Sequence, residues 1–93
     1  MENIRIHLWI YGRVHGVFFR ESLVRHAIPL GVKGFVRNIA YESCVEAVLE
    51  GPKDKVEELV KWCHEGPPQS RVDKVETLKE QYSGGYEDFR IEF

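Results

Sequence analysis

The spacing of apolar residues changes once near the start of the chain, and this change limits the folds that the chain can adopt. From Ile4 to Tyr11, apolar positions alternate with more polar ones, the period of a strand with one buried face. After a segment with a glycine near each end, Phe19, Leu23 and Ala27 recur at intervals of four, the spacing of a helix. A strand, a glycine-containing loop and a helix are therefore predicted in succession.

The end of this first helix has its own signals. Pro29 lies in the last predicted turn and cannot donate a hydrogen bond to the carbonyl four residues back. We expect the helix to kink or stop there, with Gly31 as a left-handed cap.

The middle of the chain predicts a hairpin followed by a second helix. Strands are expected at residues 33–39 and 44–50, and the short turn between them favours antiparallel pairing. Gly51-Pro52 opens the helix and Gly66 ends it. Its apolar stripe consists of Val56, Leu59, Val60 and Cys63.

Two more strands are expected toward the end of the chain. One covers residues 71–80, where Val72 and Val75 are out of phase and indicate a bulge. A turn at residues 83–85 follows, and residues 89–93 alternate as a final strand.

The order strand, helix, strand, strand, helix, strand, strand predicts an α+β fold. We expect one domain over residues 1–93, a ferredoxin-like α/β sandwich with two helices packed on one face of a mostly antiparallel five-stranded sheet. The other face of the sheet is expected to be open to water. The residues expected on that open face are Arg5, His7, Trp9 and Tyr11.

Composition excludes several classes of protein. The 13 Lys and Arg against 15 Asp and Glu give a formal charge of −2, which argues against binding to nucleic acid or membranes through bulk positive charge. Charged residues interrupt the apolar N-terminal segment, and no apolar run is long enough to span a membrane. Two cysteines are too few for a disulfide framework, although one Cys44–Cys63 bridge is conceivable. We expect a cytoplasmic monomer with reduced thiols.

The segment from Gly12 to Ser22 carries the strongest chemical signal. The first backbone N–H groups of a helix lack internal partners, and the helix dipole favours negative charge there. Glycines allow the preceding loop to turn its amides around a small anion, and Arg20 adds a guanidinium suited to phosphate oxygens. Spacing alone supports a phosphate site and an ordinary surface turn equally.

The residues themselves resemble one family. Gly12-Arg13-Val14-His15-Gly16-Val17-Phe18-Phe19-Arg20 is similar to the signature loop of the acylphosphatases. A second block, Gly34-Phe35-Val36-Arg37-Asn38 with Val45-Glu46-Ala47-Val48 and Glu50-Gly51, resembles the same family. A weaker third block is Gly66-Pro67-Pro68 with Arg71-Val72-Asp73, so the resemblance covers nearly the whole chain.

This resemblance implies hydrolysis of acyl phosphates to a carboxylate and inorganic phosphate, with no metal and no cofactor. Arg20 and Asn38 are the implied catalytic residues: Arg20 holds the phosphoryl group and Asn38 positions the attacking water. The implied phosphate cradle, mainly of backbone amides, is Val14, His15, Gly16, Val17, Phe18 and Phe19. For His15 we expect the backbone N–H to matter more than the ring. The implied partners are small acyl phosphates and phosphate, with neither nucleic acid nor membrane.

Two features depart from the family pattern. Residues 39–44 make the turn after Asn38 one residue longer than the family's and leave it without glycine, so the departure concerns the rim of the site. Pro29 is the other departure, and it concerns the helix rather than the loop.

Two binding functions compete with the enzyme hypothesis. Lys33-Gly34-Phe35-Val36 faintly echoes the RNA-contacting strand of an RNA recognition motif, but the other aromatic positions are missing and the net charge is negative. A regulator that binds an anion in the same loop without turnover is the second alternative. Cys63-His64 with the distant Cys44 lacks the spacing of a zinc site.

Overall fold

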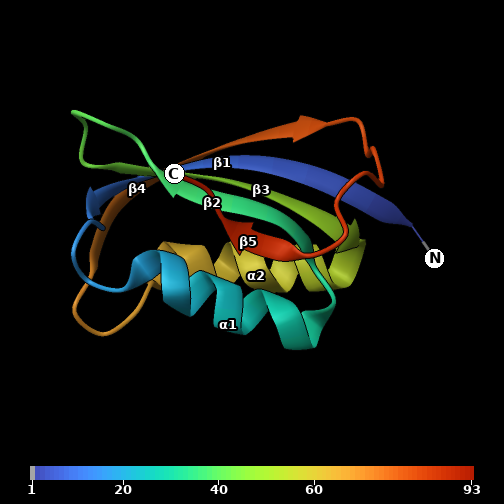
Figure 1. Cartoon of the computed structure of the whole chain (residues 1–93), viewed down its shortest axis with the longest axis horizontal. Helices are drawn as coiled ribbons and strands as arrows, with labels where there is room; N and C mark the ends of the chain where they lie inside the picture. The colour runs from blue at the N-terminus through green and yellow to red at the C-terminus, as the bar shows by residue number, and fades with distance from the viewer. Residues whose placement is uncertain (1) are drawn as a thin grey trace.

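The computed structural model describes residues 2–93 and contains two helices on one face of a five-stranded sheet (Figure 1). The elements are β1 (Asn3–Arg13), α1 (Phe19–Leu30), β2 (Lys33–Asn38), β3 (Cys44–Pro52), α2 (Lys53–Glu65), β4 (Arg71–Glu80) and β5 (Phe89–Ile91). The strand order is β4-β1-β3-β2-β5. All neighbours pair antiparallel except β2 and β5, which are parallel. The predicted fold and element order are confirmed.

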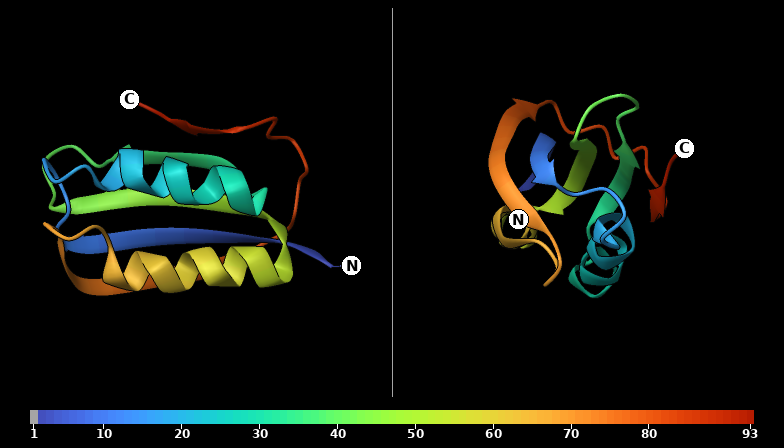
Figure 2. Two further views of the ribbon diagram at one scale, coloured as in Figure 1. Left: turned by 90° about the horizontal axis from the view of Figure 1, so that it is seen from below. Right: turned by 90° about the vertical axis from the view of Figure 1, so that its left-hand side faces the viewer.

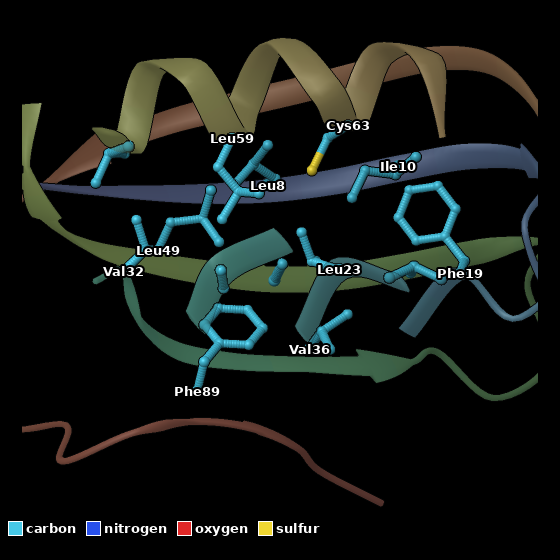
Figure 3. Packing of buried hydrophobic residues seen from close by; sticks show 14 of the residues in the cluster. Leu8, Ile10, Phe19, Leu23, Val32, Val36, Leu49, Leu59, Cys63 and Phe89 are labelled. Carbon is cyan, nitrogen blue, oxygen red and sulfur yellow. The ribbon is translucent and has the colours of Figure 1, made fainter. Parts of the chain in front are cut away.

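The two helices lie side by side beneath the sheet, as Figure 2 shows from below. The apolar core fills the space between them and the sheet (Figure 3). Leu8 and Ile10 of β1 meet Phe19 and Leu23 of α1 and Leu59 of α2 in this core, and all five side chains are buried. The alternation in β1 and the four-residue spacing in α1 each give the element one apolar face, and both faces pack into this core.

The end of α1 follows the local signals. The helix stops at Leu30, directly after Pro29, and Gly31 adopts a left-handed conformation with φ 70° and ψ 19°. Its N–H donates back to the carbonyls of Ala27 and Ile28. This confirms the predicted cap.

The predicted bulge lies in β4, opposite the end of β1. Tyr11 pairs with Lys74 while Gly12 pairs with Val72, so Asp73 is the extra residue. Gly12 has φ +137°, and a Cβ added there would lie 2.1 Å from the carbonyl oxygen of Arg71. Glycine is therefore required where β1 runs into the loop.

The final strand is shorter than the predicted strand at residues 89–93. β5 ends at Ile91 instead of continuing to Phe93, and it lies at the opposite edge of the sheet from β4. The segment between β4 and β5 therefore crosses the sheet, as the end-on view in Figure 2 shows. Strand β3 also runs on to Pro52, so α2 begins at Lys53.

The sheet face away from the helices carries an ionic network rather than a freely solvated surface. Arg5 contacts Glu80 and Glu50, and His7 lies between Glu46 and Glu80. Arg5, His7, Trp9 and Tyr11, which we expected to be open to water, are half-buried. Glu50 is only 1% exposed because the crossing segment covers it: it accepts hydrogen bonds from the backbone N–H groups of Ser83 and Gly84.

No helix among residues 2–93 is long and apolar enough to cross a membrane.

Candidate active site

Buried apolar side chains hold the β1–α1 loop in place. Val14 and Val17 are buried, whereas His15, Gly16 and Phe18 are exposed. Gly16 and Phe18 both have left-handed backbones, with φ 71° and 61°. The phenylalanine side chain is 67% exposed, so its conformation is set by the turn into α1 and not by burial of its ring.

This turn leaves a run of backbone donors available. Val14 differs from the other predicted cradle residues, because its N–H donates to the carbonyl of Gly12 at 3.1 Å. Within residues 2–93, the N–H groups from His15 to Arg20 have no acceptor in the protein, and the first bond of the helix runs from Ser22 N to Phe18 O at 3.0 Å. These donors lie at the positive end of α1, where an anion is favoured.

Asn38 is the last residue of β2 and pairs with Val45 of β3. Its side-chain oxygen Oδ1 is buried and has no hydrogen-bond partner within the described chain. Buried polar atoms are nearly always paired, so an orphaned acceptor indicates a place where a small donor such as water can bind.

Arg20, Asn38 and His15 line one open pocket of about 330 Å³. The remaining wall consists of Ile39, Ala40, Tyr41, Glu92 and Phe93. The guanidinium carbon of Arg20 lies 5.5 Å from the centre of the Phe93 ring. The tertiary structure therefore brings the two predicted catalytic residues, which are 18 positions apart in sequence, to one pocket.

The ring of His15 has a role that sequence reasoning missed. Its Nε2 donates to the carbonyl oxygen of Cys44 at 2.7 Å, and the same carbonyl accepts the N–H of Ile39 at 3.0 Å. The ring thereby links the loop to the turn that follows Asn38. A histidine between two glycines was a visible signal, but its acceptor is 29 residues away and could not be read from the sequence.

The longer turn at residues 39–44 leaves the strand pairing intact. Asn38 still pairs with Val45, and the bond from Ile39 N to Cys44 O closes the turn outside the ladder. Tyr41 supplies the left-handed residue, with φ 66°, where a glycine would be the usual choice. Three residues of this turn, Ile39, Ala40 and Tyr41, line the pocket, and Asn38 stays within the paired end of β2.

Metal-binding groups do not gather at the pocket. Across residues 2–93 there is no cluster of three or more His, Cys, Asp or Glu side chains able to hold a metal ion. Cys44 and Cys63 are buried free thiols, so the conceivable bridge between them is not formed. Burial raises the pKa of the Cys63 thiol to about 12.

Comparison with known proteins gives a consistent result. The family model for acylphosphatase matches residues 6–91. Among curated relatives, an acylphosphatase of Pyrobaculum islandicum is 52% identical over 91 residues, covering 98% of this chain and 96% of the relative. An acylphosphatase of Thermococcus kodakarensis is 50% identical over 91 residues and covers 98% of both chains.

Solved structures agree with the sequence matches. A structure of an acylphosphatase from Coxiella burnetii superposes with a TM-score of 0.91 at 38% identity, covering 97% of this chain and 93% of the other. The acylphosphatase from Bacillus subtilis gives the same TM-score at 27% identity, with 97% and 99% coverage. The similarity therefore extends over nearly the full length of both structures.

Proposed function

This chain belongs to the acylphosphatase family, and from that premise we propose how its residues hydrolyse the carboxyl–phosphate bond of an acyl phosphate. The products are a carboxylate and inorganic phosphate. The phosphoryl group is held by Arg20 and by the backbone N–H groups from His15 to Phe19, with Val14 and the other buried loop residues supporting them. Asn38 positions the water.

The observation that carries this proposal is the buried, unpartnered Oδ1 of Asn38 on the same pocket as Arg20. A guanidinium and a group of free amides suit the oxygens of a phosphoryl group, whose negative charge they neutralise. An unpaired acceptor beside them suits a water molecule, which can donate one O–H to Oδ1. The lone pair of the water oxygen then remains free for the phosphorus atom.

The proposed reaction needs little proton transfer from the protein. The water oxygen forms the new P–O bond while the bond between phosphorus and the acyl oxygen breaks, and the bonding pair leaves with the carboxylate. The proton released by the water passes to a phosphoryl oxygen of the substrate. Asn38 orients the water without acting as a base, because an amide does not accept a full proton near neutral pH. Position and charge stabilisation are the protein's contribution.

No step of this reaction needs a metal ion or an organic cofactor, because Arg20 and the loop amides supply the positive charge. Hydrolysis of benzoyl phosphate with and without a chelator tests this part. Equal rates in both conditions are expected, and a rate abolished by the chelator would contradict it.

Arg20→Ala and Asn38→Ala test the residue roles, with Arg25→Ala on the exposed side of α1 and Asn3→Ala at the exposed start of β1 as matched controls. Each site variant should lose about 10²–10³ in kcat, the usual effect of removing one group that stabilises or positions the transition state. The controls should keep their activity, and all four melting temperatures should stay near that of the unmodified protein. Full activity in Arg20→Ala would overturn the assignment. Inorganic phosphate should compete with substrate.

The same experiment separates the enzyme from an anion-binding regulator. A regulator would bind phosphate in the loop without accelerating hydrolysis. The monomeric state, the single domain and the cytoplasmic location stay predictions, and sedimentation analysis of the purified chain tests the first of them.

A further inference from the structure

The pocket has two chemically different sides. His15, Arg20 and Asn38 supply its polar groups, whereas Ile39, Ala40, Tyr41 and Phe93 form an apolar and aromatic wall. A volume of about 330 Å³ falls at the lower end of the range for small-molecule sites, so it can contain more than a phosphoryl group. An acyl phosphate held by its phosphoryl end at Arg20 would have its acyl group against the apolar wall.

One charged residue on the wall breaks this pattern. Glu92 is the single acidic residue among those that line the pocket. Its backbone N–H donates to the carbonyl of Val36 at 2.9 Å, which fixes it beside β2, two residues before Asn38. Glu92 also borders a neighbouring hollow with Glu87, Asp88 and Arg90, and Arg90 is already paired with Asp88 at 3.0 Å. Lys33 Nζ also lies nearby and donates to the Glu87 carbonyl at 3.0 Å, so three carboxylates stand against two cations on this flank.

The charge of Glu92 matters because Arg20 is neutralised once substrate is bound. The phosphoryl group of an acyl phosphate carries negative charge and compensates the guanidinium. A second anionic group on the acyl chain would then share the pocket with Glu92, with no free cation among the residues that line it. Like charges in this arrangement repel through partly hydrated surroundings.

We propose that Glu92 is a specificity residue that selects acyl phosphates with an uncharged acyl group and disfavours those with a second negative charge. Tyr41 and Phe93 favour the same substrates by attraction, through their aromatic rings. Both residues are fully or almost fully exposed beside the pocket, and the Arg20 guanidinium lies over the Phe93 ring. Such rings offer a stacking surface to a planar or apolar acyl group. This inference rests on the proposed function.

Two substrates of the same shape provide the test. 4-Carbamoylbenzoyl phosphate and 4-carboxybenzoyl phosphate differ in one charge, and the ratio of their kcat/KM values measures the penalty for that charge. At low salt the ratio should favour the carbamoyl substrate by about three- to ten-fold, the size expected for two charges several ångströms apart in a partly aqueous site. High salt should reduce this preference, since screening weakens exposed charges.

The variant Glu92→Gln should move the ratio toward that of the uncatalysed reactions. The matched control is Glu42→Gln, because Glu42 lies in the turn at residues 39–44 beside the pocket but lines a different hollow, and this variant should keep the original ratio. Using the ratio removes any general effect of the substitution on folding or turnover.

Failure of this inference can be distinguished from failure of the proposed function. If both substrates are hydrolysed equally well, or if Glu92→Gln keeps the preference, the role of Glu92 is overturned while the activity stands. If neither substrate is hydrolysed in a manner that depends on Arg20, the proposed function and the role of Glu92 fail together.

Discussion

His15 and Cys44 are joined by a hydrogen bond of 2.7 Å from the imidazole Nε2 to the backbone carbonyl. That carbonyl also accepts the N–H of Ile39, so one oxygen connects the loop before α1 with the turn after Asn38. Since the carbonyl requires a donor, Nε2 carries the proton in this contact. This bond therefore links the loop that carries the free amides to the turn that follows Asn38.

Replacing His15 by leucine should weaken catalysis more than stability. The Cys44 carbonyl keeps its bond from Ile39, so the lost contact should cost only about 1 kcal/mol of unfolding free energy. The loop can shift relative to Asn38, and we expect kcat for benzoyl phosphate to fall by about ten-fold or more. Steady-state kinetics and urea unfolding measure the two effects. His15→Gln, whose amide can donate to the same carbonyl, should retain most of the activity; equal losses in both variants would refute a role for the bond.

The two glycines of the loop should respond differently to alanine. At Gly12 the added Cβ would lie 2.1 Å from the Arg71 carbonyl oxygen, so the backbone must move at a cost of about 3 kcal/mol or more. At Gly16 nothing lies within 4 Å, and only the left-handed φ of 71° opposes the change, at a cost of about 1–2 kcal/mol. Urea unfolding of Gly12→Ala and Gly16→Ala should show this order. The reverse order would mean that the bulge opposite Gly12 is easily rearranged.

Replacing Glu50 by glutamine should loosen the segment that crosses the sheet. The carboxylate accepts from Ser83 N at 2.9 Å, Ser83 Oγ at 2.8 Å and Gly84 N at 3.0 Å, and Arg5 approaches to 3.2 Å. Glutamine replaces one carboxylate oxygen by an NH₂ group, which cannot accept a hydrogen bond from these donors. We therefore expect a loss of about 1–3 kcal/mol in unfolding free energy. Glu58→Gln, at an exposed position on α2, is the control and should be near neutral. Hydrogen exchange at Ser83 and Gly84 should speed up in Glu50→Gln alone.

The carboxylates of the ionic network should make the free energy of unfolding depend on pH in the acidic range. Burial opposes ionisation of Glu46, but hydrogen bonds from Arg37 and His7 outweigh it and lower its pKa below the ordinary value of 4.5. The pKa of Glu50 is also lowered, since bonds from Ser83, Arg5 and Gly84 outweigh its burial. A carboxyl with a lower pKa in the folded state contributes stability above its unfolded pKa and loses it as the pH falls through the folded value.

We therefore expect the urea midpoint to be maintained down to about pH 5 and to fall steadily below the unfolded value near 4.5. Glu46→Gln should lower the midpoint at neutral pH and flatten this acid dependence, since it removes one of the titrating groups. An unchanged slope in that variant would show that Glu46 does not contribute to the transition.

Local sequence signals predicted the elements because each signal acts within a few residues. The alternation from Ile4 to Tyr11 encodes β1, the spacing of Phe19, Leu23 and Ala27 encodes α1, and Gly31 after Pro29 encodes its end. The out-of-phase Val72 and Val75 likewise indicated a bulge, which the structure places at Asp73. In each case the deciding interaction is with the residue's own turn or with the core.

Other features depend on contacts between distant segments. Residues 83–85 indicated a turn, but the parallel pairing of β5 with β2 at the far edge of the sheet follows from the geometry of the whole sheet. The same crossing buries Glu50, which alternation alone cannot reveal because its cover comes from Ser83 and Gly84.

The sequence by itself determined the order of strands and helices, the family, and the residues proposed to hold phosphate and water. Only the tertiary structure decided that the Asn38 oxygen is buried and unpartnered, that His15 bonds to Cys44, and that Glu92 and Phe93 complete the pocket. The physical reason is the distance along the chain over which each interaction acts. Propensity and periodicity act between neighbours in the chain, whereas a pocket is formed by side chains that meet only after the sheet has assembled.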